Sequence, residues 1–154
     1  MSAAIVAGAL VVAGLGAAAG LLGAWLWYRG DPSTAAARAF WVLLRVGQGS
    51  ALALALIVAS LAAAGKHPRD DLFYLYALLP LAVGLIAEQL RATSAQAVLD
   101  QRGLADAQAV GTLPRDEQLG VVEQIVRREI GVMAASALVV VFLALRAAST
   151  ASGF

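Results

Sequence analysis

LFYLYALLPLAVGLIAEQLRATSAQAVLDQ, residues 72–101, is the stretch that decides the fold. Its first half is apolar, and a polar half begins at Glu88-Gln89 with no Gly or Pro at the junction. One helix can therefore cross a bilayer and continue into water, because nothing at the junction interrupts its hydrogen bonds. Glu88 then marks one edge of the membrane, and the other segments can be placed against it.

The composition is that of a membrane protein. Among the 154 residues, 61% are hydrophobic and 14% are charged, against roughly 45–50% and 25% in soluble domains. The charges are gathered between long uncharged runs, as in polytopic membrane proteins. The length corresponds to about one domain.

Several classes of function are disfavoured by the same composition. A formal net charge of +1 with no basic block gives no indication of nucleic-acid binding. The absence of cysteine excludes disulfides and thiolate metal sites. The basic residues are nearly all arginine in an alanine-rich chain, which we interpret as a GC-rich coding genome. We expect a multi-pass protein of a bacterial inner (cell) membrane.

The predicted fold is all-α, a polytopic membrane protein with four transmembrane helices and a cytoplasmic helical hairpin extending the third and fourth. The spans are expected at about residues 4–28, 40–64, 72–88 and 130–147, with the hairpin at 89–129. Residues 1–28 are uncharged and longer than the apolar core of a signal peptide, so we expect a retained helix. The hairpin arms reach equally far, roughly 21–23 Å each.

Two stripes are predicted to hold the helices together. The first span has glycines near one face, two of them in GxxxG spacing, and their missing side chains favour close packing within the chain: Gly8, Gly16, Gly20 and Gly23. In the hairpin, the second arm has apolar residues at helical spacing: Leu119, Val122, Ile125 and Val126. They are expected to pack on a stripe of the first arm: Ile86, Leu90, Ser94 and Ala97.

The basic residues predict the orientation. Eight lie on the side of residues 29–45 and 88–129: Arg29, Arg38, Arg45, Arg91, Arg102, Arg115, Arg127 and Arg128. The other side has three: Lys66, Arg69 and Arg146. Because basic residues in short loops favour the cytoplasm, loops 29–45 and 88–129 are expected inside and both termini outside.

The candidate site is a polar cluster at the inner membrane boundary: Arg45, Gln48, Glu88 and Gln89. Glu88 is expected at the depth of Arg45, and an unpaired charge at an apolar boundary is costly, so we predict that the two pair. Gln48 and Gln89 would add hydrogen bonds. The cluster would anchor the helices or, as the alternative, contact a substrate.

No motif assigns chemistry to the chain. The single histidine, His67, is expected to be a solvated residue of an outer turn, and no metal site or cofactor is predicted. Nucleophile-elbow, phosphate-loop and zinc-protease patterns are missing, and no acid falls inside an apolar run. An enzyme is therefore not expected.

The function predicted from these features is a non-catalytic accessory, scaffolding or assembly subunit of a membrane complex. Besides the lipid bilayer, its partner would be another membrane protein or a second copy, with no nucleic acid. The alternative is a small oligomeric transporter or channel with a polar path near Arg45, Gln48 and Glu88.

Overall fold

A computed structural model describes residues 2–30 and 35–151, and within these ranges the chain is helical with no strand. The helices are α1 (Ser2–Arg29), α2 (Ala35–Ala63), α3 (Leu72–Gln101), α4 (Ala107–Gly111) and α5 (Arg115–Thr150). Within the same ranges, four of them are long and apolar enough to cross a membrane: α1, α2, α3 and α5. The chain is thus a candidate multi-pass membrane protein.

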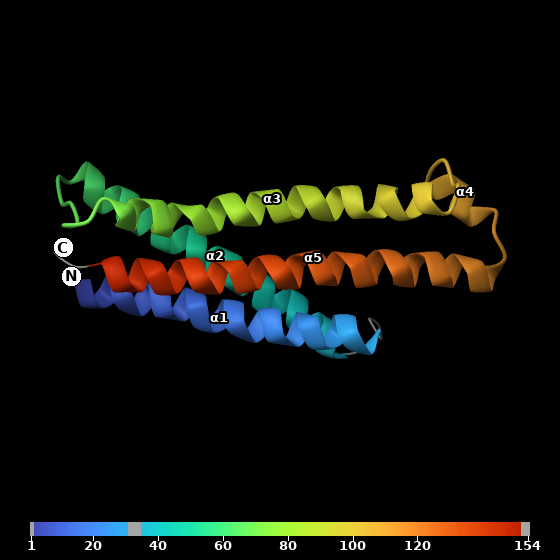
Figure 1. The fold of residues 1–154 in the computed structure, drawn as a ribbon, viewed down its shortest axis with the longest axis horizontal. Coiled ribbons are helices and arrows are strands. Elements are labelled where there is room, and N and C mark those ends of the chain that lie inside the picture. The colour runs from blue at the N-terminus through green and yellow to red at the C-terminus, as the bar shows by residue number, and fades with distance from the viewer. Residues whose placement is uncertain (1, 31–34, 152–154) are drawn as a thin grey trace.

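The four long helices run alternately up and down (Figure 1). The ends of the chain and the turn between α2 and α3 lie at one end of the bundle, and α3 and α5 extend past α1 and α2 at the other (Figure 1). Helix α5 packs extensively against both α1 and α3, and α2 packs on α1. The contact between α2 and α3 is much sparser.

The four glycines of the predicted stripe in α1 face other helices of the same chain. A Cβ at Gly8 would meet Leu54 of α2, and one at Gly16 would meet Val141 of α5. At Gly20 a Cβ would lie 2.6 Å from the Leu138 side chain, and at Gly23 it would lie 2.5 Å from the ring of Phe40. Without side chains at these positions, α1 can approach α2 and α5 closely.

Arginine side chains lie over aromatic rings at both ends of the bundle. Arg127 of α5 lies 5.9 Å from the ring centre of Trp27, and Arg146 lies 5.3 Å from that of Tyr76. The two arginines are 19 residues apart on one helix, which is about 28 Å and close to a hydrocarbon core of about 30 Å. This separation matches the thickness of a membrane core, at whose two surfaces Trp and Tyr side chains are favoured.

The extensions of α3 and α5 have an apolar core of their own. It consists of Val98, Leu99 and Val121, with residues of the connecting segment packed on it: Leu104, Val110 and Leu113. The connection begins at Gly103, whose φ of +69° is a left-handed conformation suited to glycine. Asp106 caps α4 by accepting a hydrogen bond from the Ala109 amide at 2.8 Å.

The residues expected to join the two arms differ in part from those that do. Ile125 packs against the core of the arms, whereas Val126 packs against the neighbouring cluster inside the bundle. Leu119 is 62% exposed and Val122 is 52% exposed, while Val121 is fully buried. On the other arm Ser94 is buried, but Ile86 and Leu90 are exposed. At about 100° per residue, Val121 and Ile125 share one face of α5, and Leu119 and Val122 lie well away from it.

Candidate functional site

The candidate site is a cluster of charged and amide side chains between α2 and α3. Arg45 Nη1 donates hydrogen bonds to Glu88 Oε1 at 2.6 Å and to Gln48 Oε1 at 2.7 Å. Gln48 Nε2 lies 3.4 Å from the same oxygen of Glu88. Arg45 and Gln48 are three residues apart on α2, so both side chains can turn toward α3. The pairing of Arg45 with Glu88 is therefore present.

Two further charges extend the cluster to α5. Arg91 Nε donates to the second carboxylate oxygen of Glu88 at 2.9 Å, and Arg91 Nη1 lies 4.0 Å from Glu129 Oε2. The Arg91 guanidinium also lies over the ring of Trp41, 5.7 Å from its centre. The three helices α2, α3 and α5 are thereby linked. We call Arg45, Gln48, Glu88, Arg91 and Glu129 the interface cluster.

The charges of the interface cluster compensate one another. Its two arginines face two glutamates, and both oxygens of Glu88 accept hydrogen bonds from arginine. A carboxylate held in this way is stabilised as an anion and is a poor proton acceptor. The arrangement is suited to holding helices in register, and it leaves Glu88 unsuited to acid–base chemistry.

Three of the four residues predicted for the cluster contact one another, and the fourth, Gln89, does not join them. Gln89 is exposed, and its side chain makes no hydrogen bond within the described part of the chain. Arg91 and Glu129 were not among the predicted residues. Arg91 is three positions after Glu88, a spacing at which opposite charges on a helix meet, and this signal could have identified it. Glu129 could have been found by aligning the two arms in antiparallel register.

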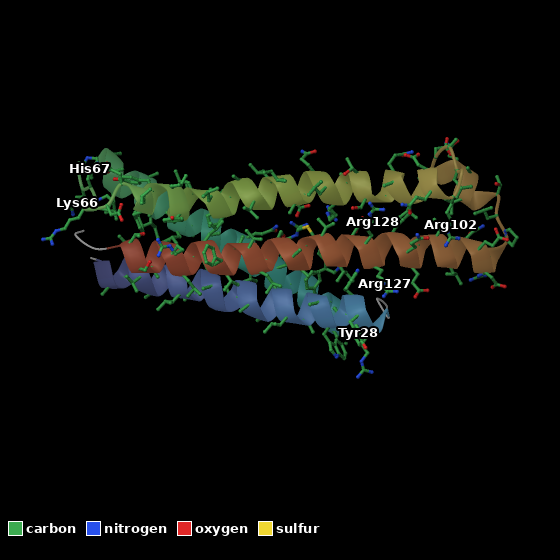
Figure 2. The ribbon with its side chains drawn as sticks, in the orientation of Figure 1. Tyr28, Lys66, His67, Arg102, Arg127 and Arg128 are labelled. Carbon is green, nitrogen blue, oxygen red and sulfur yellow. The ribbon has the colours of Figure 1, made fainter. Side chains whose placement is uncertain are left out.

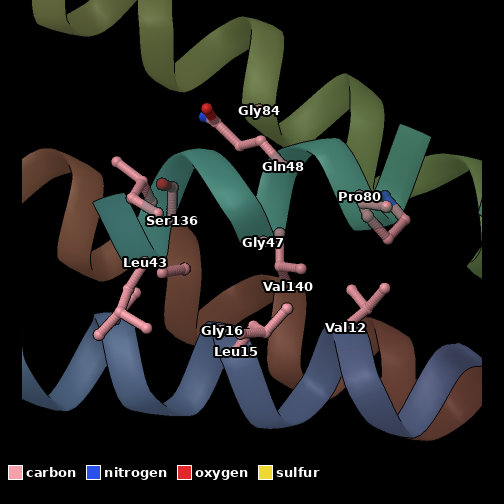
Figure 3. A pocket seen from close by; sticks show the side chains of 14 residues that line it. Val12, Leu15, Gly16, Leu43, Gly47, Gln48, Pro80, Gly84, Ser136 and Val140 are labelled. Carbon is pink, nitrogen blue, oxygen red and sulfur yellow. The ribbon is translucent and has the colours of Figure 1, made fainter. Parts of the chain in front are cut away.

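A small cavity lies on the bundle axis beside the cluster. It has a volume of about 30 Å³ and is lined by all four long helices. The Gln48 side chain extends from α2 toward α3 near Gly84, and Gly16 and Val140 close the opposite side (Figure 3). The cavity is mostly apolar and far smaller than small-molecule sites, which are typically about 300–1,000 Å³.

A larger groove opens between α2 and α3. It has a volume of about 320 Å³ and is bounded at one end by Gln48 and Glu88. It shares Gln48, Ala51, Pro80 and Gly84 with the axial cavity. The groove and the cavity are therefore adjacent, at the place where α2 and α3 make only a sparse contact.

The single histidine, His67, does not belong to this site. His67 lies in the turn between α2 and α3, at the end of the bundle where the chain begins and ends (Figure 2). It is exposed, and its Nδ1 lies 3.0 Å from the Tyr74 hydroxyl. Among the described residues, no three His, Cys, Asp or Glu side chains are grouped so that they could hold a metal ion.

No protein-family model, curated protein or solved structure matches the chain.

Proposed function

We propose that this chain is a non-catalytic accessory or scaffolding subunit of a membrane complex. Four spans anchor it, and the extensions of α3 and α5 form a cytoplasmic hairpin that docks a partner. The self-compensated interface cluster supports this role, because its arginines and glutamates are engaged with each other. The inner-membrane location and the orientation, with both termini outside, rest on the distribution of basic residues.

The observation that carries the proposal is an apolar stripe that continues past the bundle. On α5, Ala137, Met133 and Ile130 are buried against α1 and α2, and Val126 packs against the same cluster. The same helical spacing of three and four residues leads on to Val122 and Leu119, which are exposed. Both residues belong to the N-terminal part of α5, which extends past α1 and α2 (Figure 1), and no described residue buries their side chains.

The proposed ligand of this stripe is an amphipathic helix of a partner protein, which would take the place that α1 and α2 occupy lower in the bundle. Apolar side chains in a row on a helix that stands in water favour such docking. Because the two arms pack around a core of their own, they hold the stripe in a fixed position.

Photocrosslinking in intact membranes tests this role. A photoreactive benzoylphenylalanine replaces Leu119 or Val122, and Glu117 serves as the control because it is exposed and lies about 140–160° away on the same helix. Adducts with one defined protein are expected from positions 119 and 122 and not from 117. An adduct of twice the chain mass would identify a second copy as the partner. Equal crosslinking at all three positions would contradict the proposal.

The orientation has its own test, because the chain contains no cysteine. Single-cysteine variants Arg69→Cys and Arg115→Cys are treated in intact cells with a membrane-impermeant maleimide. Labelling of the first and protection of the second are expected. The reverse pattern would place the hairpin outside the cell.

A small oligomeric transporter or channel is the second candidate function. The groove between α2 and α3 favours it, because its size falls within the range of small-molecule sites and polar groups stand at one end. Flux through proteoliposomes that disappears in Arg45→Ala and persists in Arg38→Ala would support this role. Arg38 is a matched control, since it is exposed on the same helix.

A further inference from the structure

We propose that the groove between α1 and α5 is a binding site for one anionic phospholipid. The groove has a volume of about 510 Å³ and is open to the surface of the bundle. Its lining from α1 is Ala24 and Trp27, and its lining from α5 includes Arg128, Gly131, Ala135 and Leu138. Apart from Arg128, the lining side chains are apolar or belong to a tryptophan.

The groove begins at a membrane surface and runs inward. Trp27 lines the groove, and the Arg127 guanidinium lies over its ring. An aromatic ring of this kind favours the headgroup level of a membrane. From Arg128 to Leu138 is ten residues of α5, about 15 Å along the helix axis. That length is half of a hydrocarbon core of about 30 Å, so the groove is one leaflet deep. This depth suits the acyl chain of a lipid in the same leaflet.

Small residues create the hollow. A Cβ at Gly131 would lie 2.9 Å from Trp27 Cδ1, so glycine lets the indole rest against α5 and form one wall. Arg127 of the same helix also holds this residue, because its Nε donates a hydrogen bond to the Trp27 backbone carbonyl at 3.0 Å and its guanidinium lies over the ring. The wall of the groove is therefore held in place without any lipid.

Arg128 supplies the charge that selects the headgroup. Its guanidinium makes no hydrogen bond, ion pair or ring contact with any residue that the structure describes, and it is exposed. The neighbouring arginines differ: Arg127 is bound to Trp27, and Arg91 is bound to Glu88. Figure 2 shows Arg127 and Arg128 at the same level of α5, where the bundle gives way to the arms. A free cation at the rim of an apolar groove complements a phosphate esterified to an acyl-bearing lipid.

Native mass spectrometry of the intact, delipidated protein tests the site. The probes are phosphatidylglycerol and phosphatidylcholine with identical acyl chains, and inorganic phosphate as a chain-free anion. One molecule of phosphatidylglycerol is expected to bind more tightly than phosphatidylcholine, and inorganic phosphate should not displace it. Arg128→Gln should weaken phosphatidylglycerol binding about fivefold, the effect of one basic residue near an anionic surface.

Two further variants separate the groove from surface charge. Arg115→Gln removes an exposed arginine of the same helix far from the groove and should leave binding unchanged. Ala135→Trp should fill the groove and weaken both lipids, and thermal unfolding followed by circular dichroism verifies that the variants fold. Equal binding of the two lipids by the unmodified protein, or equal effects of Arg128→Gln and Arg115→Gln, would overturn the proposal. Displacement by inorganic phosphate would also overturn it, because the site would then recognise the anion alone.

Discussion

Replacing Gly23 with alanine tests how closely α1 is seated in the bundle. The new Cβ would lie 2.5 Å from Phe40 Cε2 and 2.7 Å from Ala134 Cβ, whereas non-bonded carbons prefer about 3.5–4.0 Å. Phe40 is fully buried and packs in the core between the helices, so its ring or the helices must shift to accept the new Cβ. Overpacking of this kind costs about 1–3 kcal/mol.

Gly14→Ala is the matched control, because a Cβ at Gly14 would meet nothing within 4 Å. Both substitutions replace glycine inside α1 and gain the same helix propensity, about 1 kcal/mol. Their difference therefore isolates the packing cost, and Gly23→Ala should be less stable than Gly14→Ala by about 1–3 kcal/mol. Reversible unfolding in mixed micelles of mild detergent and dodecyl sulfate, followed by circular dichroism, measures this difference. Equal stability of the two variants would refute the seating of α1 against Phe40 and Ala134.

Three further predictions concern separate parts of the molecule. Val121→Ala should destabilise the arms by about 1.5–2.5 kcal/mol, whereas Leu119→Ala should change unfolding by less than about 0.5 kcal/mol, and a reversed order would assign the arms a different interface. A double-mutant cycle of Arg45→Ala and Glu88→Ala should give a coupling of about 0.5–1 kcal/mol, since Arg45 is half exposed, and zero coupling would exclude the ion pair. Asp106→Ala should remove the cap of α4 and speed hydrogen exchange of the capped amide about fivefold, for a cost of about 1 kcal/mol; unchanged exchange would show that the cap is not formed.

The existence of the long helices could be predicted from the sequence because the pattern is strong. Uncharged runs such as Ile130–Leu145 leave a helix as the simplest way to satisfy the backbone in lipid. The junction at Glu88 was read correctly as continuous, since α3 runs unbroken from Leu72 to Gln101. Two helix boundaries coincide with residues that favour such positions: Gly103, two residues after the end of α3, adopts a positive φ, and α5 begins directly after Pro114.

The faces of α5 could not be assigned in the same way. This helix packs on α3 with one face and on α1 with another, and both faces are apolar. Counting apolar residues at helical spacing therefore selected the stripe of Leu119, Val122, Ile125 and Val126 and left out Val121. Only the placement of α3 relative to α5 reveals that Val121 meets the other arm. The link from Arg91 to Glu129 also depends on the pairing of two helices, so finding it requires the antiparallel register of the two arms in addition to the sequence pattern.

The unbroken course of α5 couples the tip of the arms to the spans. From Glu129 to Arg115 the helix continues for 14 residues, about 21 Å. No proline interrupts it, so it behaves as a strut: a tilt of about 10° at the membrane surface would swing Arg115 sideways by roughly 4 Å. A partner bound at the tip would in turn move the bundle through this rigid helix. Arg91 and Glu129 join α3 to α5 near the base of the extension.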